Sequence, residues 1–508
     1  MIIFSLQQQI DQKKIGILLS YVNIAAKILI NFLYMPVLLK YLSKDQYGLY
    51  QLLWSLSGFL AIADFGFSTA VIRYYSAARK NRNKEKLKEI LLNACSIYTV
   101  LTIILILCGI ALYFFAGLTY GAKLNAKDMA TMQITIPIMI LMMSIGLPST
   151  LLTALISAHE HFIFLKTSAL LYIIAQPIIS IFALKFIAAN IPTLVCAETL
   201  NIVLITLLNL WYCIHYLKIK PVPSLSFTPM KNEMIKFSFF MFTAFIADKI
   251  IWSSGQAVLG AMSGNISITF YSLSFYLAFA FSTIPFVISE LYLPAFSAAA
   301  SSNNMPKIQK LFQETGKLQF RVLLLFLGGF IFLGKDFIQI WLGTGYEKCF
   351  TLTSIILAGF LPDFMLSAGL PAVQALNKHG KRSVILLITS ILAILLEIFL
   401  SYKYDEYGCA CAISIMLFLG YGIATGIYYS KLGLGIKKYF AGFIRPFIAS
   451  LPAFALFFII LDISPIGGIK GFIIHGIMLT VLYSISALIF GLDDIEKERL
   501  RKHISSWK

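Results

Sequence analysis

Charged residues are scarce in this sequence. Asp, Glu, Lys and Arg make up 13% of its 508 residues, whereas soluble domains contain about 25%. Hydrophobic residues make up 59%, and the mean hydropathy is +0.84. So few charges exclude an ordinary water-soluble protein, and the composition therefore indicates an integral membrane protein.

The sequence also lacks the motifs of common enzymes and cofactor sites. No glycine-rich loop is followed by a phosphate-binding lysine, which argues against ATP hydrolysis. The seven cysteines have no framework spacing and fall mostly in apolar stretches. His159 and His161 are two residues apart and would face different sides of a helix, so a structural turn explains them better than a metal site. We therefore expect no enzyme, no metal and no organic cofactor.

Long apolar runs fill most of the chain. They predict an all-α polytopic membrane protein with about 14 transmembrane helices, because about 20 helical residues cross a bilayer core of about 30 Å. The first run is too long for the core of a signal peptide, so we expect it to remain as the first span. The predicted spans are 15–39, 49–72, 90–117, 131–156, 164–187, 192–214, 236–262, 268–295, 318–340, 350–374, 383–402, 408–429, 443–462 and 469–490.

Positive charge predicts the orientation of these spans. If the chain starts inside, most lysines and arginines fall in internal segments such as the 73–88 loop, as the positive-inside rule requires. Both termini are then expected in the cytoplasm. This topology and anionic lipid headgroups explain the net charge of +18, and no basic segment is large enough to form a nucleic-acid site.

Lys27 stands at mid-depth in the first predicted span. Its stem reaches about 6 Å, too short to bring the ammonium to a headgroup layer, and a charge at the bilayer centre costs about 2.5–3.5 kcal/mol. Steps of three or four residues place Asn23, Asn31 and Tyr34 on the same helix face as Lys27. This polar stripe predicts a helix that lines a cavity.

An internal repeat relates two parts of the chain. Lys249 follows Lys27 by 222 residues, and the polar residues Ser253 and Gln256 follow it with the spacing seen in the first stripe. Two parallel six-helix lobes, related by a pseudo-two-fold axis around a central cavity, would explain the repeat; a chance match of apolar helices is the alternative. The predicted divisions are an N-lobe at 1–227, a C-lobe at 228–435, two extra helices at 436–490 and a cytoplasmic amphipathic tail at 491–508.

Several short motifs resemble those of one family. The run from Asp64 to Ala70, Asp-Phe-Gly-Phe-Ser-Thr-Ala, with Arg73 and Tyr74, resembles a stretch of polysaccharide and O-antigen flippases of the multidrug/oligosaccharidyl-lipid/polysaccharide exporter (MOP) superfamily. The segments 39–50, 154–160 and 293–297 also look like parts of this family. His161, however, stands where the family pattern would have an arginine.

The resemblance implies a function and a location. It implies that the protein moves a lipid-linked oligosaccharide, such as an O-antigen repeat unit on undecaprenyl diphosphate, from the inner to the outer leaflet by alternating access. It also implies a multi-pass protein of the bacterial inner membrane that meets membrane lipids and the polysaccharide polymerase machinery. No nucleic-acid partner is expected.

Candidate substrate-binding residues follow from the charge of such a lipid. A diphosphate carries about two negative charges and needs cations at mid-depth, which Lys27 and Lys249 supply. Arg73 would meet the diphosphate at the cytoplasmic entrance, or is an ordinary headgroup arginine. Lys27 could instead pair with Asp64 to hold helices together. The aromatic residues Trp252 and Trp54 could stack on sugar rings. The predicted substrate-binding residues are Lys27, Lys249, Arg73, Asn23, Asn31, Tyr34, Ser253, Gln256, Trp252 and Asp64.

Carboxylates inside the spans are candidates for coupling transport to an H⁺ or Na⁺ gradient. Asp248 and Glu397 are the predicted ion-coupling residues, because they lie in the predicted spans seven and eleven, the helices that shape a cation site in flippases of the lipid II type. The role is transferred from those flippases because the helices correspond, and not because a sequence motif matches. A pair between Asp248 and Lys249 and an interfacial position of Glu397 are the alternatives.

Two other function classes remain open. A multidrug or cation antiporter of the same superfamily would have an acidic, aromatic cavity, and the two mid-membrane lysines argue against it because they repel organic cations. A membrane enzyme of glycan assembly would need a sizeable catalytic loop. The connections between the predicted spans are too short to supply one.

Overall fold

The computed structural model describes residues 2–60, 66–121, 123–222, 224–225, 228, 231–464, 467–493 and 496–497. Within these ranges the chain forms helices and no strand, so the predicted all-α fold class is confirmed. The helices form two compact units, Met1–Thr269 and Phe270–Lys508. The lobe boundary predicted from the repeat, between residues 227 and 228, differs from this division, which includes Lys249 in the first unit. The predicted lobes stay a prediction.

The first unit holds the helices that carry most of the predicted substrate-binding residues. They are α1 (Ile2–Tyr41), α2 (Lys44–Leu60), α3 (Phe67–Lys80), α4 (Lys84–Tyr120), α5 (Ala126–Ala158), α6 (Phe162–Phe186), α7 (Ile191–His215) and α8 (Lys231–Met262), and α9 (Asn265–Ala280) begins at its end. The second unit continues with α10 (Thr283–Ser301), α11 (Met305–Leu342), α12 (Lys348–Leu366), α13 (Gly369–Ala375), α14 (His379–Met416), the π-helix η2 (Leu417–Ala424), α15 (Thr425–Lys431), α16 (Ile436–Ile463) and α17 (Gly468–Phe490).

Eleven helical segments of the described ranges are long and apolar enough to cross a membrane, so the chain is a multi-pass membrane protein. The predicted count of 14 spans stays a prediction. The predicted spans 383–402 and 408–429 lie in the apolar stretch from His379 to Lys431. Two helices meet in this stretch at Asp405, whose backbone departs from helical geometry with φ 46° and ψ −130°. The connection predicted between the two spans, 403–407, contains this residue.

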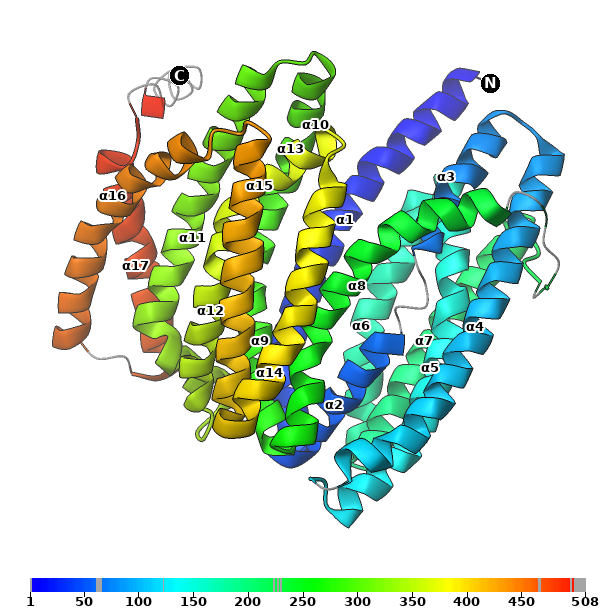
Figure 1. Cartoon of the computed structure of the whole chain (residues 1–508), viewed down its shortest axis with the longest axis horizontal. Helices are drawn as coiled ribbons and strands as arrows, with labels where there is room; N and C mark the ends of the chain where they lie inside the picture. Colours follow the sequence, from blue (N-terminus) through cyan, green and yellow to red (C-terminus); the bar gives the residue numbers. More distant parts are fainter. Residues whose placement is uncertain are drawn as a thin grey trace. The chain divides into compact units, whose positions relative to one another are not determined.

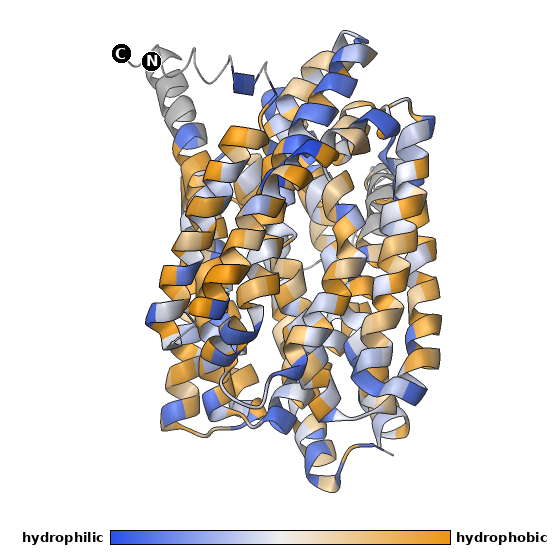
Figure 2. Ribbon diagram, turned by 90° about the vertical axis from the view of Figure 1, so that its left-hand side faces the viewer, coloured by the Kyte–Doolittle hydropathy of each residue, from blue (hydrophilic) through white to orange (hydrophobic). Residues whose placement is uncertain are grey.

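Apolar side chains cover the outer surfaces of many helices. Figure 2 shows hydrophobic residues along the lengths of the helices and hydrophilic residues near many of their ends. Leu29, Leu118 and Phe399 are 62%, 81% and 74% exposed. Contiguous exposure of this kind would be unfavourable in water, whereas in a bilayer it forms the surface that contacts lipid.

In the first unit, α5 is the helix against which the others pack. It contacts α2, α3, α4 and α7, and Figure 1 shows α4, α5 and α7 running side by side. Val71, Ile90 and Leu155 are fully buried where α3, α4 and α5 meet. Two further pairs, α1 with α6 and α2 with α8, complete the packing that positions the polar residues.

A close backbone contact fixes the start of α2 within this unit. A Cβ atom on Gly48 would stand 1.8 Å from the carbonyl oxygen of Asn265, so glycine is required there. Asn265 Nδ2 donates to Asp128 Oδ2 at 2.9 Å, and Thr269 Oγ1 donates to the carbonyl of Lys44 at 2.5 Å. These bonds join the beginnings of α2, α5 and α9.

In the second unit, α11 takes the corresponding role and packs against α10, α16 and α17. The Phe312 and Tyr439 rings stack with centroids 3.9 Å apart, and the Tyr439 hydroxyl donates to the carbonyl of Met365. Lys348 and Glu406 form an ion pair at 3.1 Å beside the turn at Asp405.

An ionic cluster ties the segment after α17 to α11 and α16. Asp493 accepts from Lys317 at 2.7 Å and from Arg445 at 2.8 Å, and Glu496 pairs with Arg321 at 2.7 Å. The hydrogen bond from Lys317 lowers the pKa of Asp493 below its ordinary value, against the opposing effect of desolvation, and the charges of Lys317 and Arg445 add to it. Most of the predicted tail, 491–508, lies outside the described residues.

We predict that acid releases this segment. A carboxyl whose folded pKa is lowered stabilises the folded state above its ordinary pKa of about 4, and this stabilisation is lost as the pH falls through the folded value. Hydrogen exchange of the full-length protein, corrected for intrinsic rates, should show lower protection of residues 487–493 at pH 3 than at pH 7, by roughly two- to fivefold. Asp493→Asn should give the low-protection result already at pH 7, and the exposed Asp462→Asn control should not.

Candidate functional site

The polar stripe of α1 faces α6. Asn23, Asn31 and Tyr34 are half-buried, while the apolar residues on the other faces, such as Leu18 and Leu33, are more than 60% exposed. Asn23 Nδ2 donates to the backbone carbonyl of Lys166 in α6 at 2.9 Å. Asn23 therefore contacts protein, and Asn31 and Tyr34 are partly covered, as expected of polar residues in a membrane.

The two predicted cations differ in their surroundings. Lys27 is exposed, and no residue in the described ranges forms an ion pair with it. Lys249 is half-buried in α8 and lies within electrostatic range of the neighbouring Asp248. Because α1 packs along α6 whereas α8 packs along α2, the lysines stand on helices with different main neighbours. Their joint role stays a prediction.

The polar residues after Lys249 lie in a helix interface. Ser253 and Gln256 are 6% and 9% exposed, and a Cβ atom on Gly58 of α2 would stand 2.6 Å from Ser253 Oγ. The Gln256 Oε1 atom is buried without a hydrogen-bond partner in the described part of the chain. Trp252 is half-buried beside them.

The remaining predicted residues are spread over both units. Arg73 is exposed on α3, with its guanidinium 5.9 Å from the centre of the Tyr74 ring. Asp64 lies outside the described residues. Asp248 is exposed in the first unit, whereas Glu397 of α14 is fully buried in the second. The ion-coupling role of both residues stays a prediction.

The most concentrated polar site in the first unit surrounds a residue outside the predicted set, Glu198 of α7. Its side chain is 3% exposed, and Oε1 accepts a hydrogen bond from the Tyr50 hydroxyl of α2 at 2.6 Å. Trp54 of α2 and Gln176 of α6 also lie against the carboxyl group. Tyr34 of α1 completes the site, so side chains from three helices converge on the carboxyl group of α7.

This site has the chemistry of a proton or cation carrier. The groups that face Glu198 are neutral, and its Oε2 atom is buried without a hydrogen-bond partner in the described ranges. A bare carboxylate is costly in such surroundings, so the group is most stable when it holds a proton or a cation. No three His, Cys, Asp or Glu residues of the described chain gather into a metal site.

A similar arrangement occurs by itself in the second unit. Tyr271 of α9 and Cys409 of α14 are buried within electrostatic range of Glu397. Tyr271 follows Tyr50 by 221 residues, close to the repeat offset. Each unit therefore places a buried tyrosine, from the first turns of a helix, near a buried glutamate.

Comparison with known proteins decides the family. The model of the polysaccharide biosynthesis protein family matches residues 13–300, more than half of the chain. The chain belongs to this family. A protein of Shigella flexneri that is classed as an O-antigen transporter is 22% identical over 385 residues, which cover 74% of this chain and 88% of that protein.

Solved structures share the fold. The lipid II flippase MurJ in an inward closed conformation has a TM-score of 0.70 at 18% identity, covering 93% of this chain and 98% of that one. An inward-facing multidrug resistance transporter of the MATE family, in the MOP superfamily, has a TM-score of 0.64 at 13% identity, covering 81% and 96%. The resemblance to a polysaccharide biosynthesis family inferred from the sequence is confirmed by the family match, and these structures show the shared fold.

Glu198 was visible in the sequence of this family member only as one of several carboxylates inside apolar spans. Its partners lie far away along the chain, since Tyr50 precedes it by 148 residues. Periodicity within one helix cannot reveal such a contact. In the sequence, only the position of Tyr34 at the end of the α1 stripe pointed toward this site.

We predict that the Tyr50 hydroxyl stabilises the fold through Glu198. Tyr50→Phe leaves the buried Oε1 atom without its donor, which should cost about 1–3 kcal/mol. The variant should melt at a lower temperature than the wild type in detergent, whereas Tyr216→Phe, at a 62% exposed position, should not. Equal melting temperatures for both variants would show that the bond contributes nothing.

A second substitution tests the charge state of the carboxyl group. Glu198→Gln keeps an acceptor for Tyr50 and removes any need to bury a charge, so it should melt at or above the wild-type temperature. A loss as large as that of Glu198→Ala would mean that an ionised carboxylate is engaged by a cation.

Proposed function

We propose that this protein is a flippase that carries a polyprenyl-diphosphate-linked oligosaccharide, such as an O-antigen repeat unit, from the inner to the outer leaflet. The observation that carries the proposal is the family match over residues 13–300 in a chain with the fold of the lipid II flippase. The similarity to an O-antigen transporter supports the class of cargo. Related proteins that transport or flip their cargo also support a role other than catalysis.

The charges of the first unit suit this cargo. A diphosphate headgroup needs a cation inside the membrane, and the Lys27 ammonium has no ion-pair partner in the described part of the chain. Asn23, Asn31 and Tyr34 on the same helix face offer amide and hydroxyl groups for sugars. An exposed lysine at mid-span would repel an organic cation, so it disfavours the drug antiporter alternative.

We further propose that an H⁺ or Na⁺ gradient drives transport. The buried carboxyl groups Glu198 and Glu397 support a coupling role, because each lies in surroundings that favour a bound proton or cation. Asp248, next to Lys249, remains the third candidate. Alternation between the protonated and the ionised form would change the cost of burying these groups and thereby the preferred conformation.

The proposed cargo also sets the location and partners. The protein would lie in the bacterial inner membrane with both termini in the cytoplasm, where its lysine-rich and arginine-rich loops meet anionic lipids. The undecaprenyl-diphosphate-linked glycan would be its substrate, and the polysaccharide polymerase machinery would receive the product in the outer leaflet.

We predict that Lys27 is needed for export. Lys27→Met removes the cation and keeps the length of the side chain, so a flippase-deficient strain complemented with this variant should show at least a tenfold loss of surface polysaccharide. Lys27→Arg should retain more than Lys27→Met, and Lys470→Met, at an exposed position of α17, should act like the wild type. Normal polysaccharide with Lys27→Met, at equal protein levels, would remove Lys27 from the mechanism.

We predict that Glu198 couples transport to protons. In proteoliposomes that contain a fluorescent polyprenyl-diphosphate sugar, an imposed pH gradient should accelerate flipping by the wild type and leave Glu198→Gln at its basal rate, since the amide cannot release a proton. A Na⁺ gradient at constant pH serves as the control. If the pH gradient still accelerates Glu198→Gln, the coupling site lies elsewhere.

A further inference from the structure

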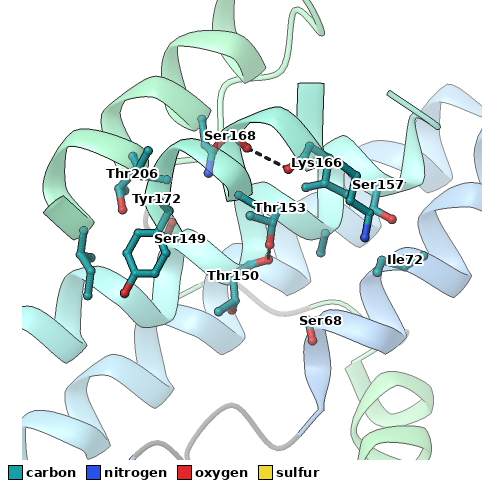
Figure 3. A pocket seen from close by; sticks show the side chains of 17 residues that line it. Ser68, Ile72, Ser149, Thr150, Thr153, Ser157, Lys166, Ser168, Tyr172 and Thr206 are labelled. Atoms are coloured by element: carbon teal, nitrogen blue, oxygen red, sulfur yellow. Dashed lines mark hydrogen bonds between the residues drawn. The ribbon is translucent and has the colours of Figure 1, made fainter. Parts of the chain in front are cut away.

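A cavity of about 570 Å³ opens among α3, α5, α6 and α7 of the first unit. It lies near the turn at 159–161, because its lining comes from the last turns of α5, 146–157, and the first turns of α6, 165–172. Figure 3 shows Lys166 and Ser157 at one end of this cavity and Tyr172 and Thr206 at the other. Its volume is that of a site for a small ligand, which typically occupies about 300–1,000 Å³.

Lys166 makes the cavity cationic. It is the one charged residue of the lining, which contains no carboxylate, and Tyr172 is the other titratable group there. No ion pair joins Lys166 to a residue in the described ranges. A lysine beside an apolar lining without a counter-ion favours an anionic ligand.

The remaining polar groups of the cavity offer mainly acceptors. Thr150 donates its hydroxyl proton to the carbonyl of Leu147 at 2.7 Å and lies 3.1 Å from the Tyr98 hydroxyl, and Thr153 donates to the carbonyl of Thr150 at 2.9 Å. A hydroxyl whose proton is used in this way still has an oxygen that accepts. These threonines can therefore receive hydrogen bonds from the hydroxyl groups of a ligand.

Two of the lining residues have no partner for a buried oxygen. Asn209 is 1% exposed, and its Oδ1 atom lacks a hydrogen bond to any described residue, as does Thr206 Oγ1. An unsatisfied buried acceptor costs about 1–3 kcal/mol, which a ligand hydroxyl would recover. This feature distinguishes the cavity from an ordinary packing gap, whose lining would be apolar.

Apolar side chains complete the lining. Ile72, Leu165, Ile202 and Ile205 face the cavity together with the ring of Tyr172. The C–H faces of a sugar ring pack well against such side chains, and an aromatic ring adds a flat surface for them. One cation, several acceptors and an apolar wall together match a hydroxyl-rich phosphate ester.

We propose that this cavity is a binding site for a sugar phosphate headgroup, with the Lys166 ammonium on the phosphate and with Asn209 and Thr206 on the sugar hydroxyls. The proposal rests on the proposed function, since it identifies the site as one that the lipid-linked glycan occupies. It adds a site within the first unit to the lysines on α1 and α8. Asn23 of α1 donates a hydrogen bond to the backbone carbonyl of Lys166 and so links the site to the α1 stripe.

Binding by the purified full-length protein tests the proposal. Native mass spectrometry would compare three probes, polyprenyl-diphosphate N-acetylglucosamine, glucose 1-phosphate and phosphatidylglycerol, on the wild type, Lys166→Met and Asn209→Leu. We expect Lys166→Met to bind the lipid-linked sugar at least tenfold more weakly, because a charge-assisted hydrogen bond is lost. Lys185→Met, at an exposed position near the other end of α6, should bind as the wild type does.

The probes distinguish the source of the phosphate ester. Binding of glucose 1-phosphate with the same dependence on Lys166 would support a site for the headgroup alone, and preference for the lipid-linked sugar would support a site for the whole substrate. Equal affinity for phosphatidylglycerol, or unchanged binding in Lys166→Met, would overturn the proposal. Lys166→Arg should restore phosphate binding, which separates loss of charge from loss of fold.

Export by the wild type separates this inference from the proposed function. If wild-type protein restores surface polysaccharide in a flippase-deficient strain while Lys166→Met binds the lipid-linked sugar normally, the cavity proposal fails and the flippase function stands. If the wild type restores no polysaccharide, the proposed function fails, and the glucose 1-phosphate experiment still decides whether Lys166 forms an anion site.

Discussion

Hydrocarbon offers no hydrogen bonds, so a polar side chain within a span is stabilised by partners inside the protein. In the first unit this constraint decides how α1 packs. Its polar face turns to α6, where Asn23 meets a backbone carbonyl, and its apolar faces stay exposed to lipid. Near the other end of the stripe, Tyr34 meets the group around Glu198. One helix thus carries polar residues through the membrane without exposing them all to lipid.

The same constraint shapes the second unit on its own. Glu397 is fully buried, and Tyr271 and Cys409 are buried within electrostatic range of it. Tyr50 and Tyr271 keep the repeat spacing, although Glu198 and Glu397 come from helices at different places in the chain order. The two units therefore satisfy one physical requirement with different backbone positions. Faint similarity at the level of residues is the expected result of such a solution.

The sequence predicted the features that depend on one helix at a time. Apolar runs predicted the membrane class, and a 3.6-residue period identified the stripe that contains Asn23 and Tyr34. It failed where a contact joins distant segments. Nothing near Ser253 indicates that Gly58 brings α2 close enough to bury it, and nothing near Glu198 identifies Tyr50 as its donor. The backbone turn at Asp405, by contrast, falls in the connection predicted between two apolar runs.

A pocket that spans several helices is hidden from sequence periodicity for the same reason. Lys166 looks like a lysine near the start of a span, where a headgroup contact is the usual explanation. The structure surrounds it with threonines of α5 and an asparagine of α7, and a bond from Asn23 ties its backbone to α1. A cation near the membrane boundary and a lysine at mid-span, without an ion-pair partner in the described ranges, then occur in order along α6 and α1. Such an order suits an anionic headgroup that must exchange partners stepwise, because no single position has to stabilise it across the whole bilayer.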